Sequence, residues 1–162
     1  MTSTIGRGLP FGKVERSQGR TVGEGEFAVL ASLTWTTRER NANKEFMVGA
    51  GETDRELAAP VVVAIVASLA ALGPANRALR EQYGVRTVAA LGLEAEFFGP
   101  VRPEDTLWAE SEVVSARDSA SRPGQGVLTW RDRGVNQRGE VVVEVTRTLL
   151  VTRDGMAREE AR

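Results

Sequence analysis

Two residue types are missing from the 162-residue chain, which contains no cysteine and no histidine. Without cysteine there can be no disulfide, no thiolate nucleophile and no thiolate metal site. Without histidine there is no imidazole base, no Ser-His-Asp arrangement and no histidine-ligated zinc. Any chemistry must therefore use carboxylates, hydroxyls, amides, Lys or Arg side chains, or the backbone.

The chain also lacks a strong charge of either sign. Charged residues make up 27% of it and the net charge is −1, which argues against a nucleic-acid or anionic-membrane partner. The first ten residues do not have the basic-then-apolar pattern of a signal peptide, so a cytoplasmic protein is expected. No Gly-rich phosphate loop, dinucleotide-binding fingerprint or metal-ligand cluster occurs, so neither a cofactor nor a metal is expected.

One stretch, residues 60–73, is apolar almost throughout, with Ser68 as its single polar side chain. It is too short for a bilayer, which needs roughly 20 apolar residues. Its early β-branched residues leave a buried strand possible, but the alanines, Pro60 at a first-turn position and Gly73 before a proline favour a helix. A helix that is apolar on every face is a buried one, so the rest of the chain is expected to enclose it.

The remaining pattern predicts an α+β protein. The Thr-x-x-Glu spacing at Thr21 suggests a capping box that opens a helix over residues 24–33. A polar, irregular segment follows at 34–59, and a further short helix is expected at 76–83. The apolar period then changes to two, which predicts an antiparallel meander of adjacent strands. The four expected strands are 86–97, 106–117, 126–135 and 140–151.

The length suggests one domain at residues 19–153. The segment 1–18 is rich in Gly and polar residues and is expected to be a loose arm. Residues 154–162 form a charged tail that is expected to fray. A long antiparallel sheet with one enclosed helix predicts that the sheet curls around the helix.

Several short sequences resemble those of the MaoC-like hydratases, also known as (R)-specific enoyl-CoA hydratases. The opening Gly19-Arg20-Thr21-Val22 before a short helix is similar to theirs. Three later turns occur in that family's order and spacing. They are Phe98–Leu107, which resembles F-x-x-P-V-x-P-G-D-T-L; residues 119–126, which resemble S-R-P-x-x-G; and Asn136–Glu140, which resembles N-Q-x-G-E.

This resemblance implies the hotdog fold, in which a sheet wraps a central helix and two such units pair, often by joining their sheets. The implied ligand is an acyl thioester bound at the interface, and the implied reaction is reversible addition of water to an enoyl-CoA. In the family, an Asp and a His within a D-x-N-P-x-H motif handle the water and its proton. A Gly amide at the start of the central helix stabilises the thioester oxygen.

The chain departs from the family at this motif. Aligned without a gap, Thr36 replaces the Asp and Asn41 replaces the His, while Arg38 and Glu39 replace the Asn-Pro pair. Neither Thr nor Asn titrates near neutral pH, so neither is a general base of the usual kind. Val61 lies nearest to the position of the helix-start glycine. The amides of Val61 and Val62 are expected to remain unpaired and to present a partial positive charge to the pocket.

The leading hypothesis is a dimeric, lyase-like member of the family that acts on an acyl or polyketide-like thioester with a reassigned acid/base. Glu39 is the candidate base because it lies inside the altered motif. The other nearby carboxylates are Glu45, Asp54 and Glu56. Each of the four is alternatively an ordinary solvated charge.

Three alternatives remain open. The chain is a non-catalytic subunit whose homologous partner carries the dyad, or an acyl-CoA-binding module, or a hotdog thioesterase that uses Asp54 or Glu56. Homodimer and heterodimer are both compatible with the sequence. In a retained pocket, hydrogen bonds to the ligand would come from Thr36, Arg38, Asn41 and Asn43, and an aromatic wall would come from Trp35. The indole of Trp35 is alternatively a core or dimer-packing group.

Overall fold

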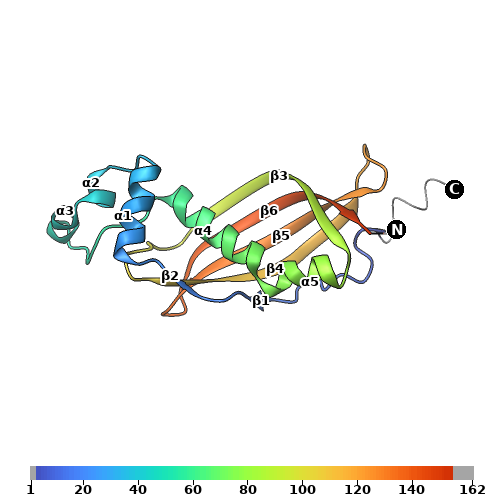
Figure 1. Cartoon of the computed structure of the whole chain (residues 1–162), viewed down its shortest axis with the longest axis horizontal. Helices are drawn as coiled ribbons and strands as arrows, with labels where there is room; N and C mark the ends of the chain where they lie inside the picture. The colour runs from blue at the N-terminus through green and yellow to red at the C-terminus, as the bar shows by residue number, and fades with distance from the viewer. Residues whose placement is uncertain (1–2, 155–162) are drawn as a thin grey trace.

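The computed structural model describes residues 3–154 and contains one six-stranded antiparallel sheet. The order of strands along the sheet is β1-β4-β5-β6-β3, and β2 also pairs with β4. Figure 1 shows α4 lying against one face of the sheet, with α1, α2 and α3 gathered into a lobe beyond one end of α4. The elements are β1 Glu15–Arg16, β2 Arg20–Thr21, α1 Glu24–Leu33, α2 Glu39–Ala42, α3 Lys44–Gly49, α4 Ala59–Leu72, α5 Pro74–Glu81, β3 Val85–Phe97, β4 Thr106–Asp118, β5 Gln125–Asn136 and β6 Val141–Arg153.

The expected helix is α4, and it packs closely on the sheet. Val62, Val66 and Leu69 are buried on its sheet-facing side. Gly134 of β5 allows this close approach, because a Cβ atom at that position would lie 2.6 Å from Cγ2 of Val66. A protein interior packed to crystal-like density cannot absorb such an overlap without moving the helix. The contact between α4 and β5 therefore depends on glycine at this position.

The chain encloses α4 on one side only, which corrects the expectation of a helix buried all round. Ala64, Ser68 and Ala71 are exposed, and 70% of the surface of Leu72 is accessible. No single helix within residues 3–154 is long and apolar enough to cross a membrane. The bent pair of α4 and α5 meets the criterion of length and composition only when the two helices are combined. An apolar helix face without a cover is typical of a surface that another protein occupies.

All four predicted strands are present, but their order is not a simple meander. Strands β4, β5 and β6 follow one another in the sheet as expected. Strand β3 does not pair with β4; it pairs with β6 at the opposite edge. The expectation of four adjacent strands was wrong because the 98–105 connection crosses the sheet instead of forming a hairpin.

Two N-terminal expectations also need correction. The first residues described do not form a loose arm, since Ile5 is fully buried and β1 pairs with β4. Thr21 does not cap α1, because it lies in β2 and the N-cap residue is Gly23. The segment 34–59 is less irregular than expected, since it contains α2 and α3. Apart from Asp154, the expected tail lies outside the described residues.

Candidate functional site

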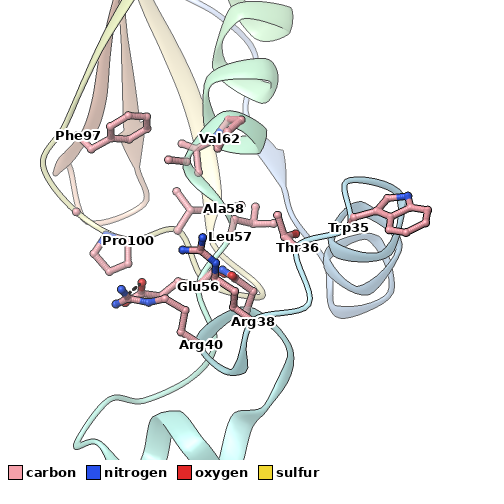
Figure 2. Close-up of a pocket in the computed structure, with 15 residues that line it drawn as sticks. Trp35, Thr36, Arg38, Arg40, Glu56, Leu57, Ala58, Val62, Phe97 and Pro100 are labelled. Carbon is pink, nitrogen blue, oxygen red and sulfur yellow. Dashed lines mark hydrogen bonds and ion pairs between the residues drawn. The ribbon is translucent and has the colours of Figure 1, made fainter.

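A cavity of about 610 Å³ lies at the N-terminal end of α4. Three segments form it: the loop after α1, the segment that leads into α4, and the turn after β3. Its surface is largely apolar, and Figure 2 shows Val62 and Phe97 on one side of the space, with Arg38 and Arg40 from the start of α2 on the other. The lining residues are Trp35, Thr36, Arg38, Arg40, Asn41, Glu56, Leu57, Ala58, Ala59, Pro60, Val62, Phe97, Gly99, Pro100 and Val101.

The start of α4 presents fewer free amides than expected. The N–H groups of Val61 and Val62 both donate to the carbonyl of Ala58, at 2.9 and 3.2 Å. Pro60 has no N–H to offer. Within residues 3–154 the N–H of Ala59 donates no hydrogen bond. The expectation that Val61 and Val62 hold the unpaired amides is therefore wrong, and the free first-turn donor at the cavity is Ala59.

Val61 and Val62 also lie on different sides of α4. Val62 lines the cavity. Val61 instead lines a separate apolar groove of about 460 Å³, between α4, α1 and the segment around Gly19. Because neighbouring residues on a helix point about 100° apart, one helix start contributes to two separate surfaces.

The two residues at the dyad positions line the cavity, but both side chains are engaged by the backbone. The Thr36 hydroxyl donates to the carbonyl of Ala31 at 3.2 Å and lies 3.0 Å from the hydroxyl of Thr34. The Asn41 amide, in a residue that is 7% exposed, donates to the carbonyl of Glu56 at 2.6 Å. In this arrangement the two side chains hold the cavity wall in shape.

Glu39 and Asn43 do not line this cavity. The Asn43 amide donates to the carboxylate of Glu39 at 2.7 Å, and its oxygen accepts the N–H of Phe46 as the N-cap of α3. Glu39 faces a second hollow of about 400 Å³ between α2 and α3. Glu39, the candidate base, and Asn43, a candidate hydrogen-bonding residue, are therefore separated from the apolar cavity.

The carboxylate that the structure does place in the cavity is Glu56, which sequence reasoning named only as a neighbour. Its Oε2 lies 3.1 Å from Nη2 of Arg40, and its Oε1 lies 3.8 Å from Nη2 of Arg102. Arg102 also binds the carboxylate of Glu52 and the carbonyl of Asp54, both at 2.6 Å. In the sequence, Glu56 differs from other carboxylates only in lying close to the start of α4. Asp54 lies there too, so this proximity could not single out Glu56.

Trp35 occupies an unusual position at the cavity rim. Its φ is +56°, a left-handed conformation that non-glycine residues seldom adopt. The side chain is 86% exposed, and Figure 2 shows the indole directed away from Val62 and Phe97. The indole of Trp35 is therefore not part of the core of this chain, and it does not form an aromatic wall of the cavity. It lies on the surface.

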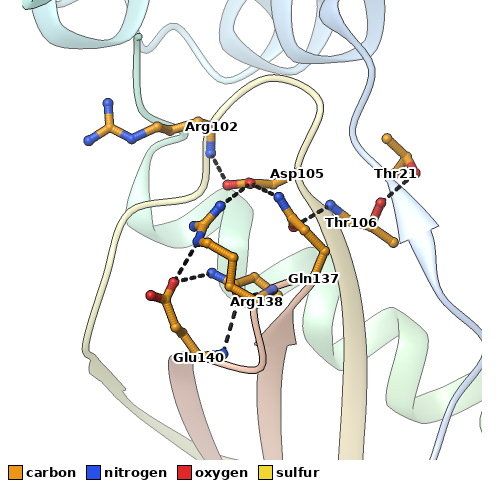
Figure 3. A network of polar contacts seen from close by, with 8 residues as sticks. Thr21, Arg102, Asp105, Thr106, Gln137, Arg138 and Glu140 are labelled. Atoms are coloured by element: carbon orange, nitrogen blue, oxygen red, sulfur yellow. Dashed lines mark hydrogen bonds and ion pairs between the residues drawn. The ribbon is translucent and has the colours of Figure 1, made fainter. Parts of the chain in front are cut away.

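A polar network fixes the turn that closes the cavity on the sheet side (Figure 3). Asp105, 4% exposed, accepts the backbone N–H of Arg102 at 2.8 Å and the side-chain amide of Gln137 at 2.6 Å. Gln137 in turn accepts the N–H of Thr106 at 3.0 Å. These bonds join the turn after β3 to the β5–β6 turn, so the position of Arg102 is set by two segments at once.

Another buried carboxylate, Asp132, lies outside the cavity, in the sheet. Burial raises its pKa, although the Arg147 guanidinium and the Ser111 hydroxyl both bond to it and favour the charged form. The indole N–H of Trp130 also donates to this carboxylate. With three donors satisfied, Asp132 supports the core and is not available to a ligand.

Comparison with known proteins is consistent with this geometry. The sequence model for the mesaconyl-CoA hydratase family matches residues 26–161. A mesaconyl-CoA hydratase of Cereibacter sphaeroides is 41% identical over 68 residues, a stretch that makes up 41% of this chain and 20% of that protein. The chain therefore aligns with about a fifth of that relative.

Two solved structures show the same fold. A MaoC-like dehydratase from Rhodospirillum rubrum superposes with a TM-score of 0.71 at 24% identity, over 90% of this chain and 94% of that one. A chain of the (3R)-hydroxyacyl-ACP dehydratase complex HadBC from Mycobacterium tuberculosis superposes with a TM-score of 0.69 at 19% identity, over 86% of this chain and 96% of that one.

The chain belongs to the mesaconyl-CoA hydratase family, a MaoC-like group. Its α+β architecture is the hotdog fold, as the resemblance of its turn sequences implied.

Proposed function

We propose that this chain is the substrate-holding half of a two-unit hydratase or dehydratase that acts on an acyl thioester. The observation that carries the proposal is the engagement of Thr36 and Asn41 by backbone carbonyls, at the two positions where the family's dyad would stand. A cavity that has an apolar lining and a free amide, but Thr and Asn at the positions of the family's Asp and His, suits binding better than proton transfer. The HadBC complex, in which dehydratase chains of this fold assemble, supports a paired arrangement.

Within such a pair, this chain would hold the thioester by its carbonyl. The N–H of Ala59 is the free donor at the cavity, and the helix start adds a partial positive charge. During hydration, a water oxygen bonds to Cβ of the double bond while electrons move toward the thioester oxygen. The amide of Ala59 stabilises that oxygen, and a proton is then returned to Cα. The partner's carboxylate and imidazole would take the proton from the water and deliver it to Cα.

The surface available to a partner is β3 together with the uncovered side of α4. Strand β3 is an edge strand, and twelve of its thirteen residues are exposed. Its end, Phe97, lines the cavity. A unit that paired with β3 would extend the sheet and would cover the cavity at the same time.

One observation favours a second candidate, an enzyme that acts without a dyad-bearing partner. Glu56 lines the cavity, so its carboxylate could exchange a proton with a water molecule held there. It is better placed for this role than Glu39. We rank this candidate second because Arg40 occupies one carboxylate oxygen at 3.1 Å and Arg102 lies beside the other. The same ion pairs also weaken Glu56 as the carboxylate of a thioesterase.

Hydration assays separate the two candidates. The chain is purified untagged from its native source, any companion protein is identified, and hydration of crotonyl-CoA is followed by loss of the enoyl-thioester absorbance. The substrate-holding role predicts no appreciable hydration by the chain alone, and activity with a homologous partner that carries an Asp and a His. The substrate-holding role would be overturned, in favour of the second candidate, by a pure homodimer that hydrates crotonyl-CoA and loses this activity in the Glu56→Gln variant.

A further inference from the structure

The face of the sheet that points away from α4 carries a row of charges across five strands. Val143 and Val145 of β6 pack in the core against α4. Glu144 lies between them and therefore points to the other face. Paired positions along β1-β4-β5-β6-β3 (Figure 1) continue this row as Arg16, Glu110, Arg133, Glu144 and Glu96. The charges are positive, negative, positive, negative and negative, so the alternation stops at the edge strand β3.

The carboxylates on β3 differ from those inside the sheet in having no cation beside them. On the inner strands, Nε of Arg133 lies 3.0 Å from the Glu144 carboxylate. On β3, Glu94 and Glu96 are exposed and point to the same face, since they are two residues apart. Within residues 3–154, no Lys or Arg nitrogen lies within 4.0 Å of either carboxylate. The open edge of the sheet thus carries two unneutralised negative charges.

Only one half of β3 presents a regular edge to another strand. The pairing of β3 with β6 is shifted at two places within residues 87–92, whereas residues 92–97 pair without interruption. Such irregularities bend a strand and hinder further pairing along its free side. A strand that joins β3 therefore has its best contact with residues 92–97, the part that contains both carboxylates.

A second copy of the chain would not supply the missing cations. Directly opposite residues of antiparallel strands point to the same face, so two copies that pair over residues 92–97 place Glu94 opposite Glu94 or Glu96 of the other copy. Opposite side chains are only about 4.5–5.5 Å apart at Cβ, and like charges there are destabilising. Arg86, the one basic residue of β3, lies outside this part and is 3.3 Å from Asp154.

We propose that the strand that joins β3 belongs to a different chain and carries two basic side chains at alternate positions, on the face away from its own helix. This inference rests on the proposed function, because it takes the partner to be a second hotdog unit whose sheet joins this one. The two cations pair with Glu94 and Glu96 and continue the alternation of charges across the joined sheet. The same carboxylates oppose self-pairing, so they select this partner over a second copy.

The chain itself provides a probe with the required charges. The variant Glu94→Lys/Glu96→Lys carries two basic side chains on an otherwise identical edge. The variant and the wild type should each self-associate weakly, since each brings like charges together. Their equimolar mixture should associate at least about tenfold more tightly than either alone, and less so at high salt. Sedimentation velocity measures this. A mixture of wild type with Glu15→Lys/Glu81→Lys, which alters β1 and α5, is the control and should show no gain.

The native complex is tested with neutral variants. Glu94→Gln/Glu96→Gln should raise the dissociation constant for the companion protein that purifies with the chain more than about tenfold, and should flatten its dependence on salt. Glu15→Gln/Glu81→Gln is the matched control and should change neither quantity.

Two results would overturn the inference. One is a wild-type chain that pairs with itself as tightly as with the Glu94→Lys/Glu96→Lys variant. The other is a Glu94→Gln/Glu96→Gln variant that binds the companion as the wild type does. In either case, a companion that confers hydration of crotonyl-CoA leaves the proposed function intact. The absence of any companion overturns both.

Discussion

Glu104 has a backbone conformation that glycine normally adopts. Its φ is +67°, and the resembling turn of the MaoC-like hydratases has Gly at this position. Its carboxylate accepts the N–H of Glu24 at 2.9 Å, while its own N–H donates to the carbonyl of Val22 at 2.8 Å. The first turn of α1 is thus capped by a residue 80 positions away and not by Thr21. The strain at Glu104 is offset by a cap that glycine could not provide.

This arrangement predicts an unusual order of stabilities at position 104. Glu104→Ala loses the cap but keeps the left-handed φ, so it should cost about 1 kcal/mol. Glu104→Gly also loses the cap but relieves a backbone cost of roughly 1 kcal/mol, so its free energy of unfolding should stay close to the wild-type value. Urea denaturation of the three proteins measures the difference. A glycine variant less stable than the alanine variant would show that the conformation at Glu104 carries no strain.

At the same scale, the sequence indicated where the cavity lies but not how its residues are used. Thr36, Arg38 and Asn41, which the alignment of the loop motif singled out, line the cavity, and their role toward a ligand stays a prediction. Their bonding could not be predicted, since the partners of Thr36 and Asn41 are backbone carbonyls whose positions depend on the folded loop. Glu56 was not singled out for a similar reason, because two arginines from other segments define its environment.

At the scale of elements, residues 3–5 bond to one carboxylate at the end of β4. Asp118 accepts the N–H groups of Ile5 and Thr4, each at 3.0 Å, and the hydroxyl of Ser3, also at 3.0 Å. The hydrogen bonds from Ile5 and Thr4 hold the pKa of Asp118 below its ordinary value. A carboxylate with a lowered pKa stabilises the folded state above the pKa of the unfolded chain, near 4, and loses that contribution as the pH falls through the folded value.

Acid should therefore loosen this segment before it affects the sheet. Hydrogen exchange at the amides of Thr4 and Ile5 is expected to accelerate as the pH is lowered from about 5 to below 4, once corrected for the intrinsic pH dependence of exchange. In Asp118→Asn these amides should exchange fast throughout this range. Amides in the centre of β5 provide the internal control. Protection at Thr4 and Ile5 that does not change with pH in the wild type would contradict the assigned role of Asp118.

The elements themselves were largely predictable because their periodicity is local. The apolar run of α4 and the period of two in the four long strands are properties of consecutive residues, and these elements were found within about two residues of their ends. The N-terminal segment was missed because its order comes from distant groups. Ile5 packs over Gly126, where no side chain would fit, and this pairing leaves no trace in the composition of residues 1–18.

At the scale of the whole molecule, a row of exposed apolar side chains follows β3. Leu91, Leu93 and Phe97 are each about half exposed along an edge strand that ends at the cavity. Half-exposed apolar side chains in a row on an open sheet edge are a surface for association. The order of strands that creates this edge could not be read from the sequence, since a connection of eight residues can form either a hairpin or a crossing.

A charge placed on this edge should weaken association without unfolding the chain. Leu93→Lys is expected to raise the dissociation constant of the complex, with itself or with a partner, more than about tenfold, because the lysine would lose hydration at the interface. Val114→Lys on β4, three strands away in the sheet, is the control and should leave association unchanged. Sedimentation velocity measures both. Equal weakening by the two variants, or none by Leu93→Lys, would place the interface elsewhere.

The pairing of β3 with β6 also has a consequence for how the protein is made. On the ribosome, β3 emerges well before its only neighbour in the sheet, which is the last strand of the described chain. Until β6 is synthesised, β3 has no strand to join, and its apolar residues stay available to any other extended chain. Contacts between such distant parts of a sequence form slowly. We therefore expect the nascent chain to pass through a period in which β3 is unpaired and open to aggregation, unless chaperones or an already folded partner cover it.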